Sequence, residues 1–384
     1  MTPSASDQHL PSRRQILRGL GVLGLAGVAG PMLAACGQSG SVDGTGSASA
    51  TRPTATPAAF KADGDITVFT YNGYIADEVI SAFTARTGIA VTLAFYADQD
   101  EAVKKLATGS TYDVVVLNST NLPRAIEGGI LRPISLASFP NAGQLQPLFT
   151  DPPYDPGAQY SAPFAVGAAG LMYRSDKVSG LTGSWSDLWL NSESDGRKFI
   201  LKDAATAIGA ALLHLGYSAS SSSPTEINAA ADALIELKPA LGGIASDPGT
   251  NQQGRSWLSQ AWSGSVFAYV VTDGTDPVAF QACREGSLFS ADVWTTAASS
   301  TAPGSAALFI DEMLSPAAVT ANVQYVGYPI PTVAGLAAFR EMVVDTPTLA
   351  TDTALINDAA QWLAPLAGDR GKLISAAWNR VLVA

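Results

Sequence analysis

The sequence predicts an α/β fold with two lobes of about 150 residues each. The chain has 384 residues, which exceeds the size of one ordinary hydrophobic core. Hydrophobic residues make up 47% of the chain and charged residues only 14%, a composition that excludes an intrinsically disordered protein. From residue 65 onward, short apolar runs typical of strands alternate with amphipathic stretches typical of helices.

The first 35 residues have the composition of a secretory signal. Arg13 and Arg14 precede a Gly-rich apolar segment, residues 19–35, which ends in the small residues before Cys36. This segment has only 17 residues and contains Pro31 and five glycines, so it would make a poor membrane-spanning helix. We therefore expect residues 1–35 to be removed on export.

Two finer features of this segment resemble known bacterial export classes. Arg13-Arg14 with Ile16 and Leu17 is similar to a twin-arginine signal, and Leu33-Ala34-Ala35-Cys36 resembles a lipobox. The resemblance implies that Cys36 carries a lipid that anchors the exported protein to the outer face of the cell membrane. Together with Cys36, the Gly-, Ser-, Thr- and Pro-rich residues 37–62 would form a flexible tether of ~25–30 Å.

The acidic charge of the chain bears on its partners. The formal net charge is −11, and loss of the signal removes three arginines and only one aspartate, so the mature chain is more acidic still. Nucleic-acid binding needs a basic face, so the charge argues against a nucleic-acid partner. It is compatible with a cationic ligand but does not identify one.

The first part of the body reads as a βαβαβ series. Its helices carry end signals, because Gly88 stops the first helix and Asp98 with Glu101 has capping-box spacing at the start of the second. We expect strands at 65–70, 89–96 and 112–118, and helices at 76–88 and 98–109. Such a series makes an open, mostly parallel sheet with a ligand crevice at the carboxyl ends of its strands.

A second series follows, beginning with a long apolar strand at 162–173. We expect helices at 184–190, 204–216 and 225–239, and strands at 198–203, 265–271, 277–283 and 288–297. The tail from Pro303 onward reads as helical, with Pro316 at a first-turn position. On pattern alone, the chain is two α/β lobes joined by strands that cross between them.

The sequence gives no specific signal for an enzyme, a metal or a cofactor. His9 lies in the signal and His214 lies in an apolar helix, while Cys283 would be the only cysteine besides Cys36. A zinc site needs three or four clustered ligands, and no G-x-S-x-G, P-loop or G-x-G-x-x-G motif occurs. A carboxylate pair of the glycosidase type is the catalytic alternative that remains open.

The order of motifs resembles the spermidine/putrescine-binding proteins of ABC importers, within the larger class of two-lobed solute-binding proteins. The motifs that carry this resemblance are "VFTYNGYIADEVISAFTARTGIAV", "YDVVVLNS", "GGILRPIS", "YSAPFAVGAAGLMY", "LKDAATAIGAALLHLGYS", "AWSGSVFAYVV", "REGSLFSADVW" and "VGYPIPT". It implies a periplasmic-binding-protein fold with two mixed sheets, flanking helices and hinge crossovers. The implied lobes are residues 63–165 with 292–332, and residues 166–291 with 333–384.

The resemblance also implies a function. A monomeric binding protein would capture a small solute by closing its lobes and would deliver it to an ABC permease, without a cofactor. A linear dicationic amine needs a carboxylate at each end. Aromatic walls suit its stem, and each cation–π contact contributes ~0.5–2 kcal/mol.

Site residues follow from the matching positions. Asp292 matches the family's amine-anchoring aspartate, and Asp203 matches the aspartate of the second lobe. Cleft aromatics are matched by Trp262, Tyr328 and Tyr74. Gly73, Thr120 and Ser290 stand where the family has further rings, and Thr206 stands where it has a glutamate. Asn118 and Ser119 are further polar candidates, in the segment after the strand at 112–118, where the sequence departs from the family's pattern.

These departures leave the ligand open. We expect a cationic, amine-bearing solute, with putrescine or spermidine as candidates, and the polar residues suit a smaller or more hydroxylated ligand. One alternative is a binding protein for another ligand, such as an amino-acid-derived amine or an iron complex. Tyr325 and Tyr328 are spaced like an iron-binding tyrosine pair, although we expect Tyr325 to be ordinary packing. The other alternative is a secreted lipoprotein hydrolase with an acid pair.

Overall fold

The predicted βαβαβ series forms the start of the folded body. A computed structural model describes residues 60–246, 254–272, 277–345, 353, 355–358 and 362–384. The series consists of β1 (Ile66–Thr70), α2 (Asp77–Thr87), β2 (Val91–Phe95), α3 (Gln99–Ala107) and β3 (Val114–Asn118). Gly88 ends α2 in the left-handed conformation at φ 75°, and the Asp98 side chain accepts the Glu101 N–H at the start of α3.

The remaining elements follow in the predicted order, with three strands that the sequence reading missed. The first half of these elements comprises α4 (Leu122–Glu127), β4 (Leu131–Arg132), β5 (Ser161–Arg174), α5 (Asp187–Leu190), β6 (Lys198–Leu201), α6 (Ala204–His214), α7 (Pro224–Leu237) and β7 (Leu241–Ala245). The second half comprises β8 (Leu258–Trp262), α9 (Ser263–Thr272), β9 (Val278–Gln281), β10 (Leu288–Ala297), α10 (Pro303–Glu312), α11 (Pro316–Val326), α12 (Val333–Met342) and α13 (Gly368–Val383). The missed strands are β4, β7 and β8.

One predicted element is wrong. Residues 265–271 were expected to form a strand but lie within α9. The six apolar residues 266–271 show neither a period of two nor a period of 3.6, so the pattern alone does not distinguish a buried strand from a buried helix. The strand at this place is β8, which ends at Trp262 directly before α9 begins.

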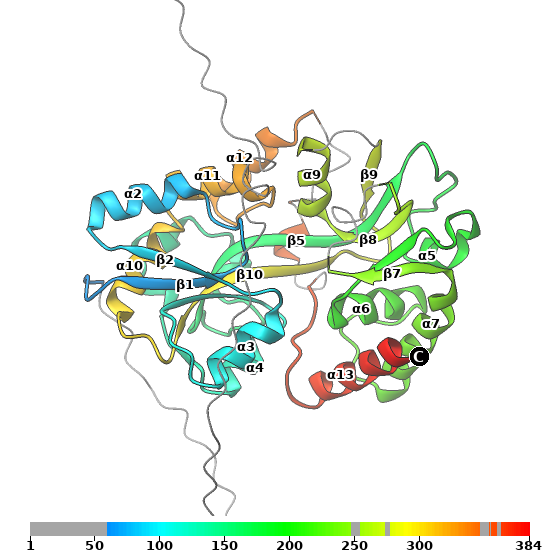
Figure 1. The fold of residues 1–384 in the computed structure, drawn as a ribbon, viewed down its shortest axis with the longest axis horizontal. Helices are drawn as coiled ribbons and strands as arrows, with labels where there is room; N and C mark the ends of the chain where they lie inside the picture. Colours follow the sequence, from blue (N-terminus) through cyan, green and yellow to red (C-terminus); the bar gives the residue numbers. More distant parts are fainter. Residues whose placement is uncertain (1–59, 247–253, 273–276, 346–352, 354, 359–361) are drawn as a thin grey trace, which may run out of the picture. The chain divides into compact units, whose positions relative to one another are not determined.

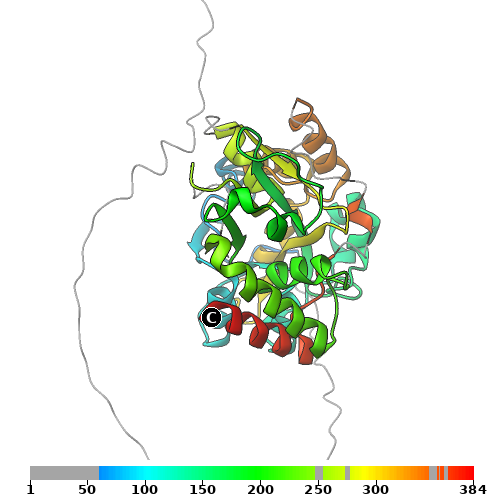
Figure 2. The same cartoon turned by 90° about the vertical axis from the view of Figure 1, so that its right-hand side faces the viewer.

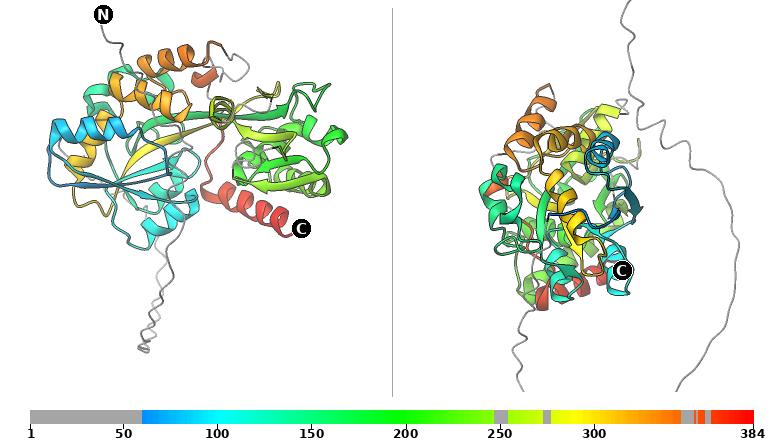
Figure 3. Two further views of the ribbon diagram at one scale, coloured as in Figure 1. Left: turned by 45° about the horizontal axis from the view of Figure 1, so that its top comes forward. Right: turned by 90° about the vertical axis from the view of Figure 1, so that its left-hand side faces the viewer.

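A single hydrogen-bonded sheet runs through the body. The strand order is β2-β1-β3-β10-β5-β8-β6-β7, with β4 added beside β10 and β9 beside β5. Pairs towards both ends are parallel, whereas the two long strands β5 and β10 pair antiparallel in the middle (Figures 1 and 3). The two mixed sheets expected from the resemblance are therefore joined through β5 and β10, and the fold is the expected two-lobed one.

Both faces of the first half of the sheet are covered, which explains the continuous apolar run of β3. Val114 and Val116 face one hydrophobic cluster with α2, α10 and α11, whereas Val115 and Leu117 face another. A third cluster is built on β6 with α6, α7 and α13, which pack together (Figure 2). Helix α12 packs on α11 in the first cluster, so we propose that it belongs to the first lobe rather than beyond a boundary at residue 332.

The predicted export features fall elsewhere. The signal, Cys36 and the tether as far as residue 59 lie outside the described residues. Within the described part of the chain, no helix is both long and apolar enough to cross a membrane.

Asp113 makes a testable contribution to this fold. The buried carboxylate accepts the N–H groups of Thr67, Thr301 and Ala302 and the Ser300 hydroxyl, and it thereby ties β1 to the loop after β10. Replacing it with alanine leaves these donors without partners, so we expect Asp113→Ala to lower the free energy of unfolding by about 3 kcal/mol. Urea denaturation measures this loss. Asp369→Ala, at a side chain that is 94% exposed, is the control and should change stability by less than about 0.5 kcal/mol.

Candidate ligand-binding site

Asp292 lies at an irregularity of the central strands. On one side it pairs with Asn118, the last residue of β3. On the other side the register with β5 shifts, because Ala291 pairs with Val166 whereas Val293 pairs with Pro163. Proline has no N–H to give to a strand ladder, and such irregularities re-aim a side chain. The carboxylate is therefore presented at the end of β3, where a parallel sheet places its ligand crevice.

The described partner of the Asp292 carboxylate is a hydroxyl group. The Tyr74 hydroxyl donates a hydrogen bond to Asp292 Oδ2. Burial raises the pKa of Asp292 to about 6, and the bond from Tyr74 offsets part of this effect. Burial and the negative charge of Asp292 also raise the pKa of Tyr74, so this tyrosine stays protonated and remains a donor. Among the described residues, no lysine or arginine contributes to the pKa of this carboxyl group.

Asp203 is both a helix cap and the second acid. Its Oδ1 accepts the Thr206 N–H at 2.8 Å and the Thr206 hydroxyl at 2.5 Å at the start of α6. Burial raises the pKa of Asp203, and the nearby charge of Asp100 acts in the same direction. Thr206 is fully buried, so its hydroxyl holds the carboxylate instead of lining open space. Both bonds use Oδ1, and among the described residues Oδ2 has no donor.

Tyr71 is a site residue that the sequence reading missed. Burial raises its pKa, and so do the negative charges of Asp292 and Asp203, which places its ring within electrostatic reach of both acids. Its hydroxyl accepts a hydrogen bond from Gln99 Nε2 at 2.9 Å. The ring lies edge-to-face with Tyr74 at 5.3 Å between centroids. Its position directly after β1, at the carboxyl end of a parallel strand, was the signal that could have found it.

The other two predicted aromatics come from different elements. Trp262 is the last residue of β8 and pairs with Ala169 of β5. Tyr328 follows α11, and the next residue, Pro329, accepts the Val166 N–H of β5 at 2.9 Å. The pKa of Tyr74 is raised in part by Tyr328, so Tyr328 lies near the Asp292 end of the site. The structure therefore brings Tyr74, Tyr328 and Asp292 together.

The predicted polar residues mainly bind one another. Ser119 Oγ lies 3.1 Å from Ser290 Oγ and also accepts the Ala291 N–H. Asn118 Oδ1 accepts the Thr120 hydroxyl and the backbone and side-chain N–H groups of Asn121, and so closes the turn into α4. These residues lie beside Asp292 along β3 and β10, and they shape the wall of the site through their mutual bonds.

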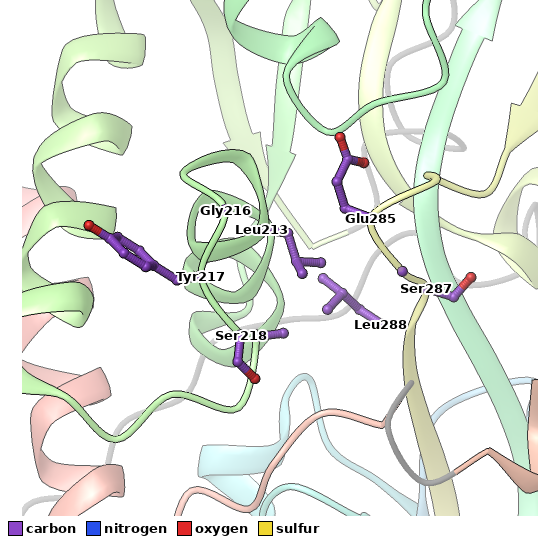
Figure 4. Close-up of a pocket in the computed structure, with 9 residues that line it drawn as sticks. Leu213, Gly216, Tyr217, Ser218, Glu285, Ser287 and Leu288 are labelled. Atoms are coloured by element: carbon purple, nitrogen blue, oxygen red, sulfur yellow. The ribbon is translucent and has the colours of Figure 1, made fainter.

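A separate hollow does not contain the predicted site. A pocket of about 340 Å³ lies between the end of α6 and the start of β10, with Leu213, Tyr217, Glu285 and Leu288 among its lining residues (Figure 4). The Glu285 carboxylate accepts the Ser184 hydroxyl and the Trp185 N–H, so it is held by protein donors. The chemistry of the two acids, rather than this hollow, identifies the candidate site.

Two other residues have packing roles. His214 accepts or donates a hydrogen bond at 2.8 Å with the Ser186 hydroxyl, and its ring stacks on Trp189 at 4.1 Å. Tyr325 packs against the first hydrophobic cluster, as expected. Among the described residues, no group of three or more His, Cys, Asp or Glu side chains could hold a metal ion.

Comparison with known proteins decides the family. A family model of bacterial extracellular solute-binding proteins matches residues 78–355. The chain belongs to this family. The solute-binding protein is 30% identical to the spermidine/putrescine-binding periplasmic protein of Salmonella typhimurium, over 79% of its own chain and 86% of that relative. It is 27% identical to the putrescine/agmatine-binding protein of Pseudomonas aeruginosa, over 77% and 86% of the two chains.

Solved structures support the fold. A putative spermidine/putrescine ABC transporter protein of Listeria monocytogenes has a TM-score of 0.74 at 21% identity, over 83% of this chain and 99% of that one. A Treponema pallidum lipoprotein has a TM-score of 0.72 at 22% identity, over 82% and 98%. The family resemblance, the two-lobed fold and the expectation of a binding protein rather than an enzyme are confirmed. The curated relatives include proteins named as periplasmic.

The raised pKa of Asp292 predicts a stability change with pH. In the unfolded chain an aspartate ionises near pH 4, but in the folded protein Asp292 ionises near pH 6. Folding therefore becomes less favourable as pH rises between these values, because the folded state holds a proton that the unfolded state releases. We expect Asp292→Asn to be more stable than wild type by about 2–3 kcal/mol at pH 7 and nearly equal to it at pH 4.

Urea denaturation at both pH values measures this difference, with Asp369→Asn as the exposed control. If Asp292→Asn were less stable than wild type at pH 7, this would contradict the expectation that the ionised Asp292 carboxylate destabilises the folded protein.

Proposed function

We propose that the protein is a lipid-anchored extracellular solute-binding protein of an ABC importer, and that it captures a cationic amine between Asp292 and Asp203. The observation that carries this proposal is that both acids act on Tyr71 while no cation acts on either acid. Burying an ionised carboxylate without a cation is costly, so the amine of a ligand supplies the partner that the protein lacks.

The distribution of cations in the chain supports a cationic ligand. Every lysine and arginine after residue 59 lies in the described part of the chain. Most of them contact surface acids or backbone carbonyls, as in the pairs Arg86–Glu312, Arg124–Asp100 and Arg380–Asp232. A ligand with its own carboxylate would need one of these cations in the site. This argues against an amino-acid-derived ligand that keeps a free carboxylate.

The curated relatives point to the same class of ligand. They are named for binding spermidine, putrescine, agmatine and cadaverine, all of which are cationic amines. Tyr71, Tyr74, Tyr328 and Trp262 supply aromatic rings for the stem of such a ligand. The hydroxyl pair of Ser119 and Ser290 beside Asp292 suits a smaller or more hydroxylated amine.

The central strands suit a hinge. Strands β5 and β10 run through the middle of the sheet, and both Asp292 and the Pro329 contact of β5 lie on them. A bound amine that touches Asp292 and Asp203 would favour the closed form, because closure brings both acids to one ligand. A monomer anchored through Cys36 would then present this form to an ABC permease.

The ligand class is tested by thermal unfolding of the protein with spermidine, putrescine, agmatine, amino acids, sugars and ferric iron. An amine at 100 times its dissociation constant should add about 2.7 kcal/mol to the free energy of unfolding. Stabilisation by another class with no effect of any amine would contradict the proposal.

The anchor is tested by Asp292→Asn in titration calorimetry. Loss of the charge should weaken amine binding at least tenfold, because it removes the charge-assisted bond. Asp369→Asn is the control and should bind as wild type does. Unchanged affinity of Asp292→Asn would show that the amine is held elsewhere.

A further inference from the structure

We propose that Gly264 and Gly167 are positioning residues that seat the Tyr328 ring and join it with Trp262 into one continuous aromatic wall. The aromatic wall is the pair formed by the Tyr328 ring and the Trp262 ring. The use of the wall for binding rests on the proposed function, whereas the seating of the ring by the glycines does not.

The face of the Tyr328 ring packs directly on Gly264. A Cβ atom on Gly264 would lie well within 3.0 Å of Cε1, Cζ and Cε2 of Tyr328, a separation that real Cβ atoms essentially never show. The three distances are nearly equal, which places this point over the ring face, since a point at one edge would lie closer to one Cε atom. Gly264 is in the first turn of α9, two residues after Trp262, so the segment that carries one ring also supports the other.

Gly167 lets the two rings meet. A Cβ atom there would lie 3.1 Å from Trp262 Cε3 and 3.2 Å from Tyr328 Cε1. These two ring atoms cannot be farther apart than the sum of those distances. A methylene chain between two carbon surfaces needs about 7 Å, which is more than that sum. At these two atoms the rings leave no room for a methylene chain between them, so a ligand that uses both rings would lie along them at this point.

The backbone around Tyr328 holds the ring in this seat. Gly327 has φ 76°, and a Cβ there would lie 3.1 Å from the Phe267 ring of α9. The Val166 N–H donates to Pro329 O at 2.9 Å, and the Tyr328 hydroxyl lies 3.3 Å from Ser265 Oγ. These contacts fix the backbone before and after Tyr328 and thereby hold its ring in place.

The aromatic wall adjoins the anchoring acid. Gly167, which lies beside both rings, pairs with Ser290 of β10, two residues before Asp292. Tyr74 donates its hydroxyl hydrogen to Asp292. A cation bound at Asp292 therefore has its stem beside the wall. An unbranched stem can follow a continuous wall along its length, so the two glycines favour slender amines over branched or bulky ones.

The experiment is a double-mutant cycle in the full-length protein with Gly264→Ala and Tyr328→Ala. An added methyl group displaces the ring, so Gly264→Ala should weaken spermidine binding at least tenfold in calorimetry. In the Tyr328→Ala background, where the ring is already gone, the same change should alter the dissociation constant less than twofold. Gly143→Ala is the matched control, because a Cβ there would meet no atom within 4 Å.

The outcomes distinguish failure of the positioning role of Gly264 from failure of the proposed function. Equal spermidine affinity of wild type and Gly264→Ala overturns the positioning role, and so does an equal loss in both backgrounds. If wild type binds no amine, the proposed function fails, and the seat is judged by melting temperature. Gly264→Ala should then lower the melting temperature of wild type but not that of Tyr328→Ala, and equal lowering in both overturns the seat.

Discussion

The candidate site is arranged around an acid that has no cationic partner among the described residues. Asp292 lies half-buried at a register shift between β10 and β5, and its described partner is the neutral hydroxyl of Tyr74. An ionised carboxylate in such surroundings destabilises the folded state, as its pKa of about 6 indicates. This destabilisation acts locally at β5 and β10, the two strands that join the lobes. In the proposed function, a ligand's cation would restore this free energy where the lobes are connected.

This arrangement links binding to closure. A ligand shifts a conformational equilibrium only by its difference in affinity for the two states. Asp292 lies on a central strand, whereas Asp203 caps α6 in the cluster of the second lobe, so in the proposed function one ligand would contact both of these parts. The charges of both acids raise the pKa of Tyr71. In the proposed function, the charge of Asp292 would provide both affinity and a reason for the protein to close.

The sequence predicted what is set locally. The βαβαβ series, the glycine end of α2 and the Asp98 cap depend on neighbours in the chain. The helix at 265–271 was missed because an uninterrupted apolar run has no period. Tyr71 and Gln99 were missed because their contact needs β1 and β2 to lie side by side. Ser119 and Thr206 were expected to face the ligand, but each has a protein partner that only the fold brings near.

The protein supports the charged forms of the two acids to different degrees, and in the proposed function this would make them unequal anchors. Asp203 accepts two hydrogen bonds from Thr206 at the N-terminus of α6, where the helix dipole also favours a negative charge. Asp292 has one bond from Tyr74 and no helix end. Asp203 caps α6 whether or not a ligand is bound, so the helix already stabilises the charge of Asp203. The charge of Asp292 has little such support, so in the proposed function a ligand's amine would contribute more binding free energy at Asp292 than at Asp203.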